Sequence, residues 1–112
     1  MSDKVYDLSQ LEELAGGSEE FVHSMIETFL EHTPGQLEEM KTAHAQKDWK
    51  TMGGIAHKIK PNIDLFGIKS IYSEIREVEN KGKNEQPDEA LNGEIGKVDE
   101  VLKTAFEQLR TL

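Results

Sequence analysis

The residues of this chain best suited to chemistry gather around His57. Lys58 and Lys60 flank it, and an open imidazole beside cations suits nucleophilic attack on an anionic group such as a phosphoryl group. Lys60 follows by three residues, so on a helix its ammonium can reach a phosphate carried by His57. A surface histidine taken alone is most often a solvated side chain without a function, so its setting decides which interpretation holds.

A helix over residues 49–66 is predicted to present His57. Its apolar residues recur every three or four positions and lie roughly opposite His57 on a helical wheel, so His57 is predicted to face solvent. Asp48 is the expected N-cap, and Gly67 the expected end of the helix. The apolar residues are Trp49, Met52, Ile55, Ile59, Ile63 and Phe66.

The predicted outer face of this helix carries residues that disfavour helices. Glycine costs about 1 kcal/mol relative to alanine inside a helix, and proline about 3. Gly53 and Gly54 remove side-chain bulk one turn before His57, so a partner could approach closely. Pro61 cannot donate to the carbonyl of His57 and is predicted to bend or loosen that turn. The predicted docking surface consists of Gly53, Gly54, Lys58, Pro61 and Asp64.

One short motif resembles the histidine-containing phosphotransfer (HPt) domain family: residues 56–68 read AHKIKPNIDLFGI. The family pattern is histidine, any residue, an apolar residue, lysine, glycine, small residues, and a glycine ten positions after the histidine. The residues that fit are His57, Ile59, Lys60 and Gly67. Pro61 replaces the usual glycine, and Asn62 the usual serine or alanine.

The resemblance implies a phosphocarrier in a multistep His-Asp phosphorelay. His57 would accept a phosphoryl group from the aspartate of one response-regulator receiver domain and pass it to another, with Lys60 near the phosphate. A hybrid sensor histidine kinase is a further candidate partner. The chain would be a covalent carrier rather than an enzyme with its own ATP site, since it has no Gly-x-x-x-x-Gly-Lys-Ser/Thr loop. It would need no cofactor, because the receiver supplies Mg²⁺.

Two other classes of function stay open at the level of the sequence. The chain could be a non-catalytic helical adaptor or dimerisation module in which His57 is incidental. It could also be a hydrolase or a metal-dependent enzyme, and Glu20 and His23 have the Glu-x-x-His spacing of dimetal bundles. Such a site needs a second copy of the motif, which this chain lacks, so no metal site is predicted.

Length and charge bound the remaining possibilities. The 112 residues suffice for a single domain, here expected to span residues 1–112. A formal net charge of −9 argues against binding to nucleic acid or to an anionic membrane. No apolar segment approaches the roughly 18 residues of a membrane span. We therefore expect a monomeric, cytoplasmic protein.

The apolar periodicity predicts an all-α fold, an up-and-down four-helix bundle with an additional short N-terminal helix. The short helix should end at Gly16 and Gly17, and the next should begin after Ser18. Thr33 and Pro34 either start a new helix or mark a proline kink within a longer one. Later helices should cover residues 68–81 and a segment that starts at Pro87 or Asp88. The bundle seam of the last helix is predicted to be Leu91, Ile95, Val98, Leu102, Ala105 and Leu109.

The helix after Ser18 has an apolar arc wider than one bundle seam requires. Its members are Phe21, Val22, Met25, Ile26, Phe29 and Leu30. Either the helix is deeply buried, or part of the arc near Met25 or Phe29 stays exposed as a docking patch beside His57.

Overall fold

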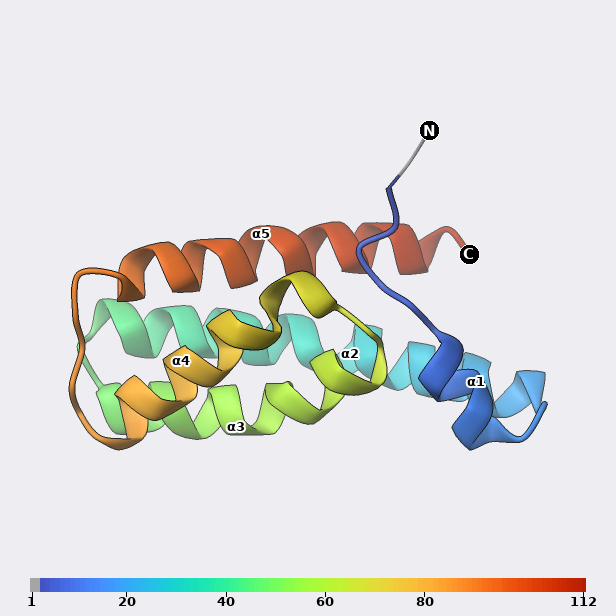
Figure 1. The fold of residues 1–112 in the computed structure, drawn as a ribbon, viewed down its shortest axis with the longest axis horizontal. Coiled ribbons are helices and arrows are strands. Elements are labelled where there is room, and N and C mark those ends of the chain that lie inside the picture. The colour runs from blue at the N-terminus through green and yellow to red at the C-terminus, as the bar shows by residue number, and fades with distance from the viewer. Residues whose placement is uncertain (1–2) are drawn as a thin grey trace.

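The computed structural model describes residues 3–112 and is all-helical over that range (Figure 1). No strand occurs among these residues, which confirms the all-α prediction. The elements in chain order are α1 (Ser9–Ala15), α2 (Glu19–Ala45), α3 (Trp49–Leu65), the short 3-10 helix η1 (Lys69–Ile71), α4 (Tyr72–Lys83) and α5 (Leu91–Arg110).

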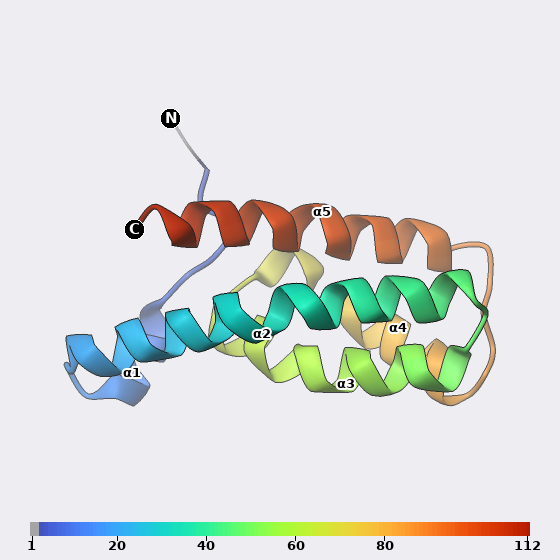
Figure 2. The ribbon, with the colours of Figure 1, turned by 180° about the vertical axis from the view of Figure 1, so that it is seen from behind.

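The four longer helices lie side by side, and α1 sits at one end of them (Figure 1). Helix α3 packs against α2 and α4, and α5 packs against the same two helices. Seen from behind, α2 runs between α3 and α5 (Figure 2). None of the described helices is long and apolar enough to cross a membrane. Because α3 packs against the two long helices α2 and α4, one of its faces is left for solvent.

The predicted seam of α5 is confirmed, because all six of its residues are buried. Burial of each large apolar side chain contributes roughly 1.5 to 3 kcal/mol. The interpretation of Phe29 as part of a docking patch is wrong. Phe29 is only 2% exposed and stacks on Phe66, with ring centroids 4.3 Å apart. Met25 is partly buried against the core, so most of the wide arc on α2 serves packing.

Helix α2 starts where the sequence predicts and then continues through Pro34. The hydroxyl of Ser18 accepts a hydrogen bond from the backbone N–H of Phe21, as an N-cap should. The structure favours one long helix over two, so Thr33 is no cap. Its side chain is buried inside the helix, and Thr33 Oγ1 has no hydrogen-bond partner.

Helix α5 starts at Leu91, later than the predicted Pro87 or Asp88. The side chain of Asp88 explains the difference, because it is used in the loop. Asp88 Oδ1 accepts from the backbone N–H of Ala90 at 3.0 Å and from Lys81 Nζ at 2.9 Å. The loop therefore has its own hydrogen bonds, and the helix starts after it.

The N-terminal segment is fastened to the bundle before α1 begins. The backbone N–H of Asp7 donates to the carbonyl of Phe66 at 3.0 Å, and that of Val5 donates to the side chain of Gln108. Gly67 follows the end of α3 with φ +59°, where a Cβ would overlap the backbone of Asp7. Its predicted role at the helix end is confirmed, and it also admits the N-terminal segment.

Candidate functional site

His57 lies in the middle of α3 on the face directed away from the core. The residues that anchor this turn, Ile55, Ala56 and Ile59, are buried. The imidazole itself is 58% exposed, which confirms the predicted solvent-facing position. The buried apolar face of α3 thus directs the His57 side chain to the opposite, solvent-exposed face.

A buried carboxylate from α4 orients the imidazole. Glu79 Oε2 lies 2.6 Å from His57 Nδ1, and only 7% of the Glu79 side chain is exposed. An ionised carboxylate can only accept hydrogen bonds, so Nδ1 carries the proton and donates it. The neutral ring then has its lone pair on Nε2, the nitrogen that remains free of this contact. The geometry selects the tautomer suited to nucleophilic attack from Nε2.

Two lysines complete a charged cluster around Glu79. Lys60 Nζ donates to Oε1 at 2.7 Å, and Lys83 Nζ lies 2.8 Å from Oε2. Burial by itself would raise the pKa of Glu79, but the hydrogen bonds from Lys60, Lys83 and His57 outweigh it and lower that pKa to about 2. Glu79 is therefore ionised at neutral pH and remains an acceptor for His57.

Comparison with protein families matches the Hpt domain to residues 24–112, which is most of the chain. The matched segment contains His57, Lys60, Glu79 and Lys83. This chain belongs to the Hpt domain family. Domains of this family act in phosphotransfer of the His-Asp phosphorelay kind and interact with response-regulator receivers. Searches of curated proteins and of solved structures gave no significant match.

The predicted place of Gly53 on the open surface of this Hpt domain is wrong. Gly53 is buried where α3 crosses α4, opposite Gly82. A Cβ on Gly53 would lie 2.7 Å from the backbone nitrogen of Lys83 and 3.0 Å from the carbonyl oxygen of Glu79. The absent side chain admits another helix of the same domain, and the close approach brings Glu79 to His57.

The other predicted docking residues differ in their accessibility. Gly54, Lys58 and Pro61 are exposed on α3, and nothing lies within 4 Å of a Cβ added at Gly54. Asp64 is instead paired with α4, because both of its carboxylate oxygens accept from Arg76 Nη2, at 3.0 and 2.8 Å. The structure thus leaves three of the five residues on an open surface next to His57.

Sequence reasoning missed Glu79 in this Hpt domain. A signal was present, because Glu79 falls within the apolar arc of its helix, next to Val78 and four residues after Ile75. Carboxylates are rarely fully buried unless they are paired. A lone acidic residue in an apolar arc therefore indicates a buried partner, although it does not say which one.

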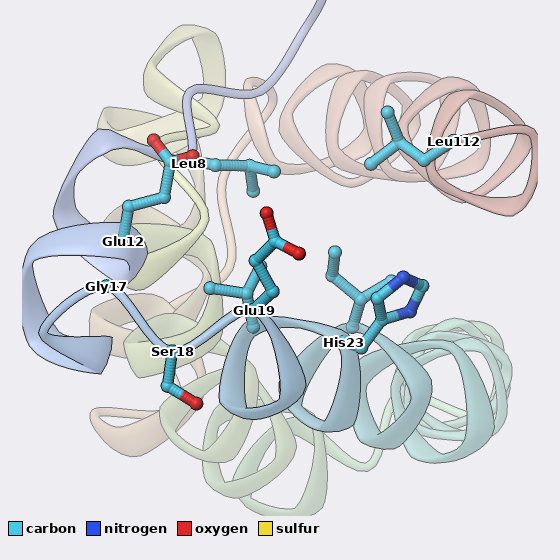
Figure 3. Close-up of a pocket in the computed structure, with 9 residues that line it drawn as sticks. Leu8, Glu12, Gly17, Ser18, Glu19, His23 and Leu112 are labelled. Atoms are coloured by element: carbon cyan, nitrogen blue, oxygen red, sulfur yellow. The ribbon is translucent and has the colours of Figure 1, made fainter.

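A cavity of about 510 Å³ lies away from His57, at the end of the bundle where α1 meets α2 (Figure 3). Apolar side chains such as Leu8 and Leu112 line it together with the polar side chains of Glu12 and His23. Among the described residues, no group of three potential ligands is placed to hold a metal ion. His57 does not line this cavity and lies on an open surface instead.

Proposed function

We propose that His57 carries a phosphoryl group on Nε2 between the aspartates of response-regulator receiver domains. The hydrogen bond between His57 Nδ1 and Glu79, with Nε2 left open to a partner, is the observation that carries this proposal. A transfer needs a nucleophilic nitrogen at the surface, because the donor is itself a folded domain. His57 combines that exposure with a tautomer that the hydrogen bond from Nδ1 to Glu79 fixes.

In the proposed step, the lone pair of Nε2 attacks the phosphorus of the aspartyl phosphate. A bond forms between Nε2 and phosphorus while the bond from phosphorus to the aspartate oxygen breaks, and the aspartate leaves as a carboxylate. The ring keeps its proton on Nδ1 and gains positive charge. Glu79, ionised and 2.6 Å away, stabilises that charge. Passing the group to a second receiver reverses the same step.

Lys60 is proposed to hold the phosphoryl oxygens. Its side chain is 26% exposed, and its ammonium already lies 2.7 Å from Glu79 Oε1. An ammonium has three donors, so contact with Glu79 leaves others for a phosphate. A loose phosphoryl transition state needs mainly positioning and charge stabilisation, which a lysine fixed by a carboxylate provides. Lys58 is exposed and is proposed to serve as a docking charge.

In this proposal, the receiver supplies the components of the transfer site that this domain lacks. The receiver contributes its acidic pocket and Mg²⁺, and the domain described here adds neither a cofactor nor an ATP site. Gly54 and Pro61 leave room for the receiver to approach, since both are exposed on α3. We propose that an up-and-down arrangement of α2 to α5 supports the site and that the carrier works as a monomer in the cytoplasm.

The test is transfer from a panel of purified receiver domains, loaded with Mg²⁺ and radioactively phosphorylated. We expect the wild type to take up an acid-labile, alkali-stable label, and His57→Gln to take up none. His23→Gln is the matched control, because His23 is also exposed on a helix but lies on α2. If no receiver that passes its label to another carrier labels the folded wild type, the phosphocarrier proposal fails and a helical adaptor is favoured.

A further inference from the structure

The cavity between α1 and α2 has an apolar floor. Leu8 and Val22 are half-buried and pack against the hydrophobic core, and Ile26 is buried. The volume of about 510 Å³ falls within the range of small-molecule binding sites, which is roughly 300 to 1,000 Å³. The cavity therefore has the size of a site for one small organic molecule.

Two carboxylates, one from each helix, accompany this floor. Glu12 of α1 and Glu19 of α2 both line the cavity. Figure 3 shows the Glu19 side chain directed into the space between Leu8 and Leu112. Glu12 also lines an adjoining cavity of about 430 Å³, which shares Leu8 and Leu112 with the first. The two cavities thus meet at Glu12, and they offer an elongated path to a ligand.

The turn from α1 to α2 brings these carboxylates to one place. Gly16 and Gly17 have φ values of +60° and +90°, in the region that favours glycine. The chain reverses there, so α1 packs against α2 and buries Leu11 completely. The helix dipole favours a negative charge in the first turn of α2, where Glu19 lies. The packing of α1 on α2 therefore fixes the position of both carboxylates.

No basic side chain of the described residues neutralises these two carboxylates. The ion pairs among residues 3–112 use other acidic residues. Lys4 lines the adjoining cavity, but its ammonium lies over the ring of Tyr6, 5.9 Å from the centroid. His23, which also lines the first cavity, has an acceptor nitrogen when its imidazole is neutral. The cavity thus combines negative charge with apolar surface, which suits a ligand that combines a cation with a hydrocarbon chain.

We propose that this cavity binds a primary aliphatic amine as its ammonium ion. The ammonium group donates its hydrogen bonds to Glu12 and Glu19. The hydrocarbon chain lies on Leu8 and Val22, where it displaces water from apolar surface. This inference goes beyond the proposed function, because the site lies away from His57 and binding involves no transfer of a phosphoryl group.

The test is a titration of the full chain with n-octylamine, followed through the protein's methyl resonances in two-dimensional NMR. We expect saturable shifts of the methyl groups of Leu8, Val22 and Ile26. The shorter n-hexylamine should bind more weakly, because each buried methylene strengthens binding by up to about fourfold. Octanoate has a similar hydrocarbon chain with the opposite charge, so it should leave these resonances unshifted.

Three variants test the two carboxylates. Glu12→Gln and Glu19→Gln should each raise the Kd for n-octylamine about two- to fivefold, the range expected for exposed ion pairs. Glu20→Gln is the matched control, because Glu20 lies in the same first turn of α2 but lines neither cavity. It removes the same charge and should bind n-octylamine as the wild type does. Far-UV circular dichroism of each variant verifies that the helices are retained.

Four outcomes would overturn the inference. Equal weakening by Glu19→Gln and Glu20→Gln would mean that only the net negative charge of the protein attracts the amine. Equal affinity for n-octylamine and octanoate would mean that the carboxylates do not select the ligand. Shifts confined to methyl groups outside the cavity, such as those of Leu65, would place binding elsewhere, and the absence of any saturable shift would exclude the site. None of these results depends on phosphoryl transfer, so the phosphocarrier proposal is tested separately.

Discussion

Replacement of Gly53 by alanine tests the close contact between α3 and α4. A Cβ at this position would lie 2.7 Å from Lys83 N, 2.9 Å from Gly82 C and 3.0 Å from Glu79 O. All three atoms belong to the backbone of α4, so no side chain can rotate away. The neighbouring Gly54 provides the control, because a Cβ added there meets nothing within 4 Å.

The expected magnitude follows from comparing the two variants. Each replacement of glycine by alanine inside a helix gains about 1 kcal/mol from propensity. Only Gly53→Ala also has the cost of overpacking, typically about 1 to 3 kcal/mol. The propensity gain cancels in the comparison, so Gly53→Ala should be less stable than Gly54→Ala by about 1 to 3 kcal/mol. At roughly 4 °C per kcal/mol, their Tm values should differ by about 4 to 12 °C.

The assay is urea unfolding followed by far-UV circular dichroism, with the free energy of unfolding obtained by linear extrapolation. Gly54→Ala should be more stable than the wild type by about 1 kcal/mol. Because α4 must move away in Gly53→Ala, Glu79 should also shift relative to His57, and phosphoryl acceptance should slow while the protein is still folded. Equal stability of the two variants would refute the inferred contact.

Four further predictions concern the charged cluster and the core. Glu79→Gln should slow phosphoryl acceptance roughly tenfold or more with helix content retained, because the ring loses its anionic hydrogen-bond partner; single-turnover transfer measures this. The pKa of Glu79 is lowered to about 2 from 4.5, so its ionised form stabilises the fold above pH 4.5 by up to about 3 kcal/mol and the effect disappears as the pH falls toward 2. The stability difference between wild type and Glu79→Gln, measured by urea unfolding, should accordingly shrink as the pH falls from 5 to 3. Lys60→Ala should slow transfer or shorten the half-life of the phosphorylated form, followed by loss of label, whereas a wild-type rate and half-life would exclude Lys60 as a phosphate ligand. Leu102→Ala, at a fully buried position, should destabilise the bundle by about 2 to 5 kcal/mol in the same unfolding assay with transfer intact below its Tm.

Periodicity within single helices predicted much of the architecture. The predicted seam of α5 and the large buried apolar residues of α3 recur at steps of three and four, so these buried positions could be read along the chain. The caps at Ser18 and Asp48 were equally visible, because a cap acts within three residues of its own position. The exposure of His57 follows from the same local pattern.

Features that depend on a second helix could not be predicted in this way. A helical wheel placed Gly53 near His57 on the outer face. The wheel contains no information on where α4 crosses α3. Only the packed structure shows that Gly53 meets Gly82, so that its missing side chain admits a helix rather than a partner. Similarly, Phe29 belongs to a wide apolar arc, and its stacking on Phe66 decides that it is buried.

The sequence by itself thus determined that a helix presents His57 on its outer face with Lys60 three residues later, because both depend on spacing along one chain segment. The tertiary structure decided how the histidine is oriented. Glu79 lies 22 residues after His57 and reaches it at 2.6 Å only because two glycines let α3 and α4 approach closely. Contacts between distant segments depend on backbone separation and crossing geometry, which local periodicity does not encode.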